Sequence, residues 1–155
     1  MSSEYPDEVT VVEMLPRDGF QRLDEWIPTE TKVEIIDTLS TTGVDEIEFT
    51  SFTHPDIVPN LRDAEEVAET IERHPDVTYR ALVPNRVGAE RAASVGVDKV
   101  NALITCSPEY NQKNQNMTIE ENVEEIGEIT SLAHDHGIEV EAGIGMSFFS
   151  LYEGR

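Results

Sequence analysis

Cysteine, positive charge and long apolar runs are all scarce in this sequence of 155 residues. Its one cysteine, Cys106, cannot form an internal disulfide, so we expect a reducing compartment, the cytoplasm. No run of about 18 apolar residues is present, which excludes a membrane-spanning helix. The first residues carry no basic segment followed by an apolar one, so we expect no secretory signal.

Positive charge is scarce enough to exclude several classes of partner. The chain has 11 Lys+Arg against 32 Asp+Glu, a formal net charge of -21, and three of its basic residues are lysines. Such a surface repels phosphates and anionic lipid headgroups, so we expect neither nucleic acid nor membrane as a partner. A dense acidic surface with few lysines is typical of a halophilic protein, in which salt screens the self-repulsion. An acidic protein adapted to ordinary salt is the alternative.

A repeated junction organises the chain. Gly43, Gly96 and Gly137 each follow an amphipathic helical stretch and open a short β-branched run, at spacings of 53 and 41 residues. Glycine suits a left-handed helix stop because it has no Cβ to clash. Helix, glycine and strand in repetition predict a parallel sheet built from successive βα units.

The pattern predicts four complete βα units and a fifth strand. Thr29 and Asp63 are expected as helix N-caps, and Thr118 with Glu121 as a capping box. The expected strands are residues 9–14, 46–50, 77–83, 99–104 and 138–146, and the expected helices are residues 30–42, 64–71, 87–95 and 118–136.

Two architectures use such units. A doubly wound sheet of five strands would be complete at this length, whereas a (β/α)₈ barrel needs about 250 residues. Neither glycine-rich phosphate-binding motif is present, which gives no support to the nucleotide-binding forms of the open sheet. Residues 15–28 after the first strand are too many for an ordinary βα loop, so we look for function there.

Arg17 and Asp18 stand at the carboxyl end of the first expected strand, followed by Gly19. A carboxylate such as Asp18 suits a divalent cation, and the guanidinium of Arg17 suits a substrate oxygen that gains negative charge. Gly19 would let the backbone turn sharply. The alternative is an ordinary Asp-Gly turn with Arg17 in solvent.

Glu48 alternates with Ile47 and Phe49 on the second expected strand and so faces the opposite side. A carboxylate inside a sheet barrel is costly unless a cation pairs with it, and Arg17 is its natural partner. The alternative is that Glu48 points to water at the strand end.

Three further residues are weaker candidates. His134 and His136 have the spacing of a metal pair, but they fall in the last turn of a helix, at the end of the sheet opposite the expected site. Cys106 has no basic neighbour, so we favour a plain small side chain over a nucleophile.

The string VEMLPRDGFQ over residues 12–21 resembles the strand-one signature of the 3-hydroxy-3-methylglutaryl-CoA (HMG-CoA) lyase family, one of the metal-dependent pyruvate-carboxyltransferase-like barrels. The similarity continues nearly to Arg155, with Phe20, Phe49 and a one-residue shift after the fourth strand as departures. Further matching segments are residues 47–52, 55, 58–59, 63, 84–85, 112–116, 119–121 and 152–155.

The resemblance implies a (β/α)₈ TIM barrel, of which residues 1–155 are the N-terminal part of the domain: the first four βα units plus strand five. It implies cleavage of HMG-CoA, an acyl-CoA substrate of leucine degradation, to acetyl-CoA and acetoacetate with Mg²⁺ or Mn²⁺ as cofactor. Asp18 would be a metal ligand, Arg17 would stabilise the enolate-like charge, and Glu48 would orient Arg17 or the substrate hydroxyl. Gln21 and Ser51 would line the substrate site.

In the family pattern the remaining metal ligands lie beyond Arg155. One carboxylate cannot hold a cation tightly, so we expect this chain alone to be inactive and to act as a homo-oligomer or with a C-terminal half. Two alternatives stay open. One is an acyl-CoA/2-oxo acid condensing synthase of the isopropylmalate, citramalate or homocitrate type, although Pro16 and Phe20 favour the lyase. The other is a non-catalytic half-barrel oligomer.

Overall fold

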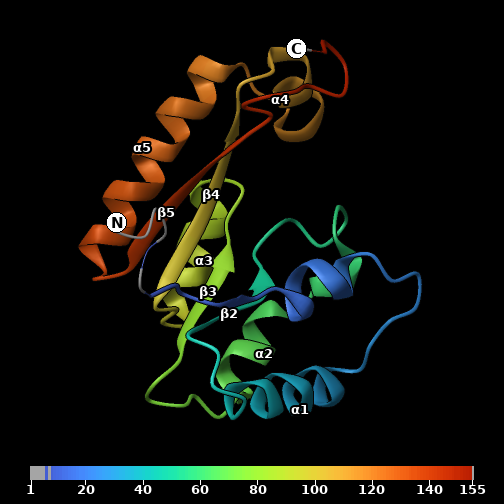
Figure 1. The fold of residues 1–155 in the computed structure, drawn as a ribbon, viewed down its shortest axis with the longest axis vertical. Coiled ribbons are helices and arrows are strands. Elements are labelled where there is room, and N and C mark those ends of the chain that lie inside the picture. The colour runs from blue at the N-terminus through green and yellow to red at the C-terminus, as the bar shows by residue number, and fades with distance from the viewer. Residues whose placement is uncertain (1–5, 7, 155) are drawn as a thin grey trace, which may run out of the picture.

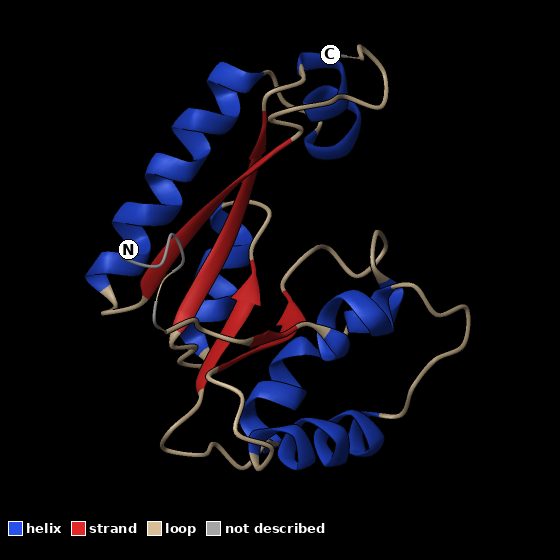
Figure 2. Ribbon diagram, viewed as in Figure 1, coloured by secondary structure: helices blue, strands red, loops and turns tan. Residues whose placement is uncertain are grey.

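The computed structural model describes residue 6 and residues 8–154. One sheet holds the strands β1 (Val12–Glu13), β2 (Glu46–Ser51), β3 (Thr78–Leu82), β4 (Lys99–Thr105) and β5 (Glu139–Gly145). All neighbouring strands are parallel, and their order in space follows their order in the chain. A doubly wound sheet reverses its order at a switch point, so the open-sheet alternative does not hold. The five strands form a curled half barrel (Figure 2).

Helices cover one side of this sheet. They are α1 (Thr29–Ser40), α2 (Ala64–Thr70), α3 (Arg86–Ser94), α4 (Pro108–Gln115) and α5 (Ile119–Asp135), with a π-helical turn η1 (Leu15–Gly19) and a 3₁₀ turn η2 (Pro59–Leu61). Figure 1 shows α1, α2, α3 and α5 along the outside of the curved sheet, and α4 at the end of β4. The four βα units and the fifth strand predicted from the sequence are therefore present.

The junction glycines have the conformation that the pattern predicts. Gly43, Gly96 and Gly137 have φ of 87°, 66° and 71°, in the left-handed region. A Cβ at any of the three would meet no atom within 4 Å, so backbone conformation and not space requires glycine there.

The hydrophobic core lies between the sheet and the helices. On β2, Ile47 and Phe49 are buried in it, and Phe49 packs edge-on against Tyr79 with ring centroids 6.4 Å apart. Ile36 of α1 and Ile129 of α5 close the core from the helical side. Because side chains alternate along a strand, the neighbours of Ile47 face the inside of the half barrel instead.

Of the three expected helix caps, Thr29 is wrong, Asp63 stands at the expected position without a capping bond, and Thr118 is confirmed. Thr29 is the first residue of α1, and its hydroxyl donates to Asp63 Oδ2 at 2.8 Å. Asp63 precedes α2 but makes no capping bond, because its carboxylate binds Thr29 and the ammonium of Lys32. Thr118 and Glu121 form the predicted capping box at the start of α5.

The sequence pattern missed α4. Its residues are almost all polar, so no apolar stripe marks it, although Ser107 caps its start and Asn116 ends it at a φ of 56°. Arg155, which closes the matching segments, lies outside the described residues. None of the helices described here is long and apolar enough to cross a membrane.

Candidate active site

A π-helical turn places Arg17 at the carboxyl end of β1. The amide of Asp18 donates to Met14 O at 2.8 Å, and the amide of Phe20 closes the turn on Leu15 O. Gly19 has no positive φ, and a Cβ there would meet only the exposed side chain of Leu15, at 2.7 Å from its Cδ1. The expected sharp backbone turn is therefore a helical turn.

Glu48 of β2 is fully buried inside the half barrel, so the alternative in which it points to water is wrong. Its Oε1 accepts a hydrogen bond from Arg17 Nε at 2.5 Å, which is the pairing expected from the sequence. Its Oε2 accepts from Arg80 Nε at 3.2 Å and from Asn101 Nδ2 at 3.1 Å. A buried carboxylate with two cations and an amide is a satisfied one.

Arg80 connects Glu48 to a second layer of charges within the half barrel. Its Nη1 donates to Glu46 Oε2 at 2.9 Å, and Nη1 and Nη2 donate to Glu141 at 3.0 and 2.9 Å. Burial acts to lower the pKa of Arg80, but the hydrogen bonds that it donates to Glu141 and Glu46 outweigh this effect and raise that pKa. The same bond to Arg80 lowers the pKa of Glu141.

Lys99 completes this layer. Its ammonium lies 2.5 Å from Glu46 Oε1 and 3.5 Å from Glu139 Oε1, and the bond to Glu46 raises its pKa. Arg80, Lys99 and Asn101 were not predicted as site residues from the sequence. A signal was available, because the strands carry polar residues at alternate positions, as in Glu46 and Glu48, and these all face inward.

A cavity of about 430 Å³ opens at the carboxyl ends of the strands. Arg17, Gln21 and Asn101 line it, with Asn85 and Tyr110 among the other polar residues of its wall. Arg17 donates from Nε to Glu48 and from Nη1 to Asp18. Across the described residues no acceptor bonds its Nη2. Arg17 thus lines the cavity and keeps one guanidinium nitrogen without an acceptor among the described residues.

The remaining predicted site residues, Asp18 and Ser51, differ in their exposure and in their contacts. Asp18 is 42% exposed in its side chain, and its two oxygens meet Arg17 Nη1 at 3.1 Å and Arg22 Nη2 at 3.2 Å. Ser51 is fully buried and hydrogen-bonds the hydroxyl of Thr53 at 2.7 Å. Thr53, and not Ser51, lies in the cavity wall. Arg17, Glu48 and Gln21 are thus brought together, while Ser51 lies behind the wall.

Metal ligands are sparse in this part of the chain. Among the described residues no three His, Cys, Asp or Glu side chains are grouped to hold an ion. His134 lies in the last turn of α5, and His136 Nδ1 lies 2.9 Å from Leu132 O. Cys106 is exposed just after β4. The interpretation of the two histidines as parts of a helix end agrees with this geometry.

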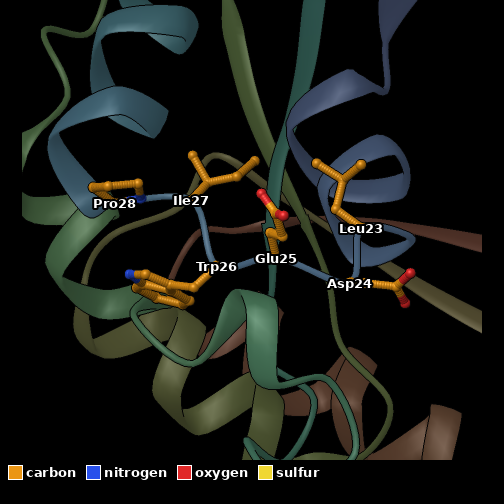
Figure 3. Close-up of a pocket in the computed structure, with 6 residues that line it drawn as sticks. All are labelled: Leu23, Asp24, Glu25, Trp26, Ile27 and Pro28. Carbon is orange, nitrogen blue, oxygen red and sulfur yellow. The ribbon is translucent and has the colours of Figure 1, made fainter.

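A second hollow, of about 440 Å³, lies along residues 23–28 and contains none of the predicted site residues. Figure 3 shows this segment between η1 and α1, with Ile27 turned to one side and Trp26 to the other. None of the residues that line this hollow belongs to the charge cluster around Glu48.

Residues 8–152 match the HMGL-like family model, which is almost the whole described chain. The chain belongs to the HMGL-like family. Family membership agrees with the half barrel and with the Arg17–Glu48 pair at its carboxyl end.

Two curated relatives are hydroxymethylglutaryl-CoA lyases. Hydroxymethylglutaryl-CoA lyase YngG of Bacillus subtilis is 40% identical over 149 residues, which cover 96% of this chain and 50% of that protein. The mitochondrial hydroxymethylglutaryl-CoA lyase of Gallus gallus is 37% identical over 97% of this chain and 51% of its own length. The chain therefore spans about half the length of the curated relatives it matches.

Solved structures of this family superpose closely on the half barrel. The Bacillus subtilis HMG-CoA lyase aligns with a TM-score of 0.93 at 39% identity and covers 97% of this chain and 51% of that one. An HMG-CoA lyase from Acinetobacter baumannii, in complex with coenzyme A and 3-methylmalate, aligns with a TM-score of 0.90 at 36% identity over 94% and 48%. These are TIM-barrel lyases, so the fold predicted from the sequence is confirmed.

Proposed function

We propose that this protein takes part in the metal-dependent cleavage of HMG-CoA to acetyl-CoA and acetoacetate. The observation that supports this most is the state of Arg17. The fully buried Glu48 carboxylate binds Nε of Arg17, Nη2 of Arg17 has no acceptor among the described residues, and Arg17 lines a cavity at the carboxyl end of the sheet. In barrels of this kind that end carries the chemistry.

We assign a separate role in the proposed reaction to each predicted site residue of this chain. Arg17 would donate from Nη2 to the substrate oxygen that gains negative charge as the carbon–carbon bond breaks, which stabilises the transition state. Glu48 would hold Arg17 in that orientation. Gln21 would contact the substrate from the cavity wall, and Ser51 would act from behind it through Thr53.

Asp18 would supply one oxygen to a divalent cation, Mg²⁺ or Mn²⁺. Its carboxylate is half exposed beside Arg17, so it fits one ligand position, but the described residues offer no complete ligand set. When bound, such a cation polarises oxygens of the substrate. We expect this chain alone to bind Mn²⁺ with a Kd of about 0.1–1 mM, as other weak sites do, and Asp18→Asn to abolish that binding in a calorimetric titration. A micromolar Kd would contradict this ligand count.

Several properties of the whole protein belong to the same proposal. We expect the 155-residue chain alone to be inactive, and activity to need a homo-oligomer or a chain that carries the remaining barrel strands. The exposed strand β5 and the exposed Phe148, Phe149 and Leu151 after it support such an association. The single cysteine and the acidic surface support a cytoplasm of high salt.

The test starts from the protein isolated from its native cells, whose intact mass is compared with the 17.4 kDa of this chain. We expect it to release acetoacetate from HMG-CoA in molar KCl with Mg²⁺ or Mn²⁺. Arg17→Lys, introduced at the gene, should lower this rate by about 100-fold or more, because the oxyanion loses a preorganised donor. Arg73→Lys, at the other end of the sheet, is the matched control and should leave the rate unchanged.

The condensing alternative finds no support among the relatives described above, all of which are lyases. It still defines the contrary result. Should the native protein join acetyl-CoA to a 2-oxo acid while HMG-CoA stays untouched, the lyase assignment would be wrong. A folded oligomer with neither activity would favour the non-catalytic half barrel.

A further inference from the structure

The Glu48 carboxylate is held by donors from three separate segments. Arg17 from η1 binds Oε1, while Arg80 of β3 and Asn101 of β4 both bind Oε2. The two oxygens therefore have different partners. Oε1 binds Arg17 of η1, and Oε2 binds donors from the two strands β3 and β4.

Arg80 is itself a rigid anchor. It is 3% exposed, and its guanidinium meets Glu46 and both oxygens of Glu141 in addition to Glu48. Arg80 thus joins β2, β3 and β5 through fixed bonds, and its side chain has no freedom to follow a moving Glu48. Asn101, which also lies in the cavity wall, adds the second bond to Oε2.

We propose that Arg80, together with Asn101, is a positioning residue for Arg17 that acts through the Glu48 carboxylate. A carboxylate bound by Arg17 alone can turn about its last torsion, which has broad minima. Two bonds at Oε2 fix the carboxylate plane, so that Oε1 meets Arg17 Nε and holds the guanidinium at the cavity that Arg17 lines. The inference deepens the proposed function, since it concerns the residue that would meet the substrate.

The experiment follows the Arg17 Nε–H group by ¹⁵N NMR, and it needs no substrate. The signal is assigned by its absence in Arg17→Lys, and its hydrogen exchange is measured in the wild type and in Arg80→Met. We expect exchange about tenfold faster in Arg80→Met, because a charge-assisted hydrogen bond to Glu48 is lost. Asn101→Ala removes one neutral donor and should accelerate exchange about threefold.

Lys99→Met is the matched control. Lys99 is a buried cation of the same charge cluster, but it binds Glu46 and Glu139 and does not touch Glu48. We expect its loss to leave Arg17 exchange within about twofold of the wild type, since that bond is not altered. An equal acceleration in Lys99→Met would mean that Arg17 responds to general loosening, and the inference would be overturned.

Two further results would overturn it. One is unchanged Arg17 exchange in a folded Arg80→Met variant. If Arg80→Met does not fold, as judged by circular dichroism, Asn101→Ala decides, and unchanged exchange there is equally fatal. The lyase assay fails or succeeds separately. A protein without lyase activity can still show Arg17 loosened by Arg80→Met, and an active lyase can show it unaffected.

Discussion

The molecule contains two buried clusters of charged residues, and they differ in the partners that surround the buried cation. The Glu48 cluster, made of Glu48, Arg17, Arg80 and Asn101, lies inside the half barrel. The Lys32 cluster lies outside it, between α1 and the start of α2, and consists of Lys32, Asp63, Thr29, Asn60 and Trp26. Both bury ionic groups almost completely, so burial of charge alone does not separate a site from a structural joint.

In the Lys32 cluster the cation has two acceptors and an aromatic ring around it. The ammonium donates to Asn60 O and to Asp63 Oδ1, each at 2.6 Å, and lies 3.7 Å from the centroid of the Trp26 ring. Arg62 also packs on the Trp26 ring, 3.6 Å from the same centroid. Burial lowers the pKa of Lys32, and Asp63 opposes that effect. Arg17 differs because its Nη2 has no acceptor among the residues described, and because Arg17 lines a cavity.

The largest expected effect comes from breaking the Lys32 cluster. Asp63→Ala leaves the Lys32 ammonium buried without its carboxylate, and we expect a loss of about 3–5 kcal/mol in the free energy of unfolding. Asp56→Ala is the matched control, because Asp56 is 91% exposed in its side chain and should change stability by less than about 0.5 kcal/mol. Urea unfolding followed by circular dichroism measures both.

Hydrogen exchange of the Arg17 Nε–H group, measured in the same Asp63→Ala variant, shows whether the two clusters are independent. If the two clusters are independent, Asp63→Ala destabilises the chain but leaves the exchange of the Arg17 Nε–H group unchanged under native conditions. A loss below about 1 kcal/mol for Asp63→Ala would mean that Lys32 finds water, and the cluster would then be no structural joint.

The next effect comes from removing the charge of Glu48 without changing its shape. Glu48→Gln keeps the volume but weakens three hydrogen bonds to buried donors, so we expect a loss of about 1–3 kcal/mol in unfolding free energy. Exchange of Arg17 Nε–H should accelerate at least as much as in Arg80→Met. Glu46→Gln, which removes a neighbouring buried carboxylate on the same strand, should cost similar stability but loosen Arg17 less than Glu48→Gln, because Glu46 reaches Glu48 only through Arg80.

Added salt should stabilise the protein by screening its surface charge, and it should not change the contribution of the two buried clusters. With a net charge of -21, the chain should gain from screening, so we expect the Tm to rise by about 3 °C or more from dilute buffer to molar KCl, roughly 1 kcal/mol. Buried pairs are screened far less, so Asp63→Ala and Glu48→Gln should cost the same at both salt concentrations. A Tm that is highest in dilute buffer would refute the halophilic interpretation.

The fold was open to prediction because its signals are local. Each glycine junction requires a left-handed residue, and each helix shows its apolar stripe within a few residues. The exceptions follow from the same principle. The polar helix α4 has no stripe, and Asp63 matches the position of an N-cap while its partner Lys32 stands 31 residues away.

The site was only partly predictable, because its partners lie on different strands. Arg17 and Glu48 could be paired because they stand at the ends of neighbouring strands. The contact of Glu48 with Arg80 depends on the register of β2 against β3, which pairs Glu48 with Arg80. The alternation of polar residues marks Arg80 as facing inward, but no local pattern gives the register that makes it the partner of Glu48.

The smallest expected effect is a pH dependence that links Glu141 to the Glu48 cluster. The hydrogen bond from Arg80 holds the pKa of Glu141 below its ordinary value of 4.5. A carboxylate with a lowered folded pKa stabilises the protein above its unfolded pKa, and that stability is lost as the pH falls through the folded value. Because the Glu141 side chain is 51% exposed, its contribution should be below about 1 kcal/mol.

Glu65, whose pKa is lowered by its bond to Arg91 outside the half barrel, provides the comparison for this last effect. Unfolding free energies measured between pH 7 and pH 3 should fall less steeply in Glu141→Gln and in Glu65→Gln than in the wild type. Only Glu141→Gln should also loosen Arg17, because Glu141 holds Arg80 and Arg80 holds Glu48. If Glu65→Gln loosened Arg17 equally, the anchoring of Arg17 would depend on the stability of the whole sheet and not on the chain of bonds through Arg80.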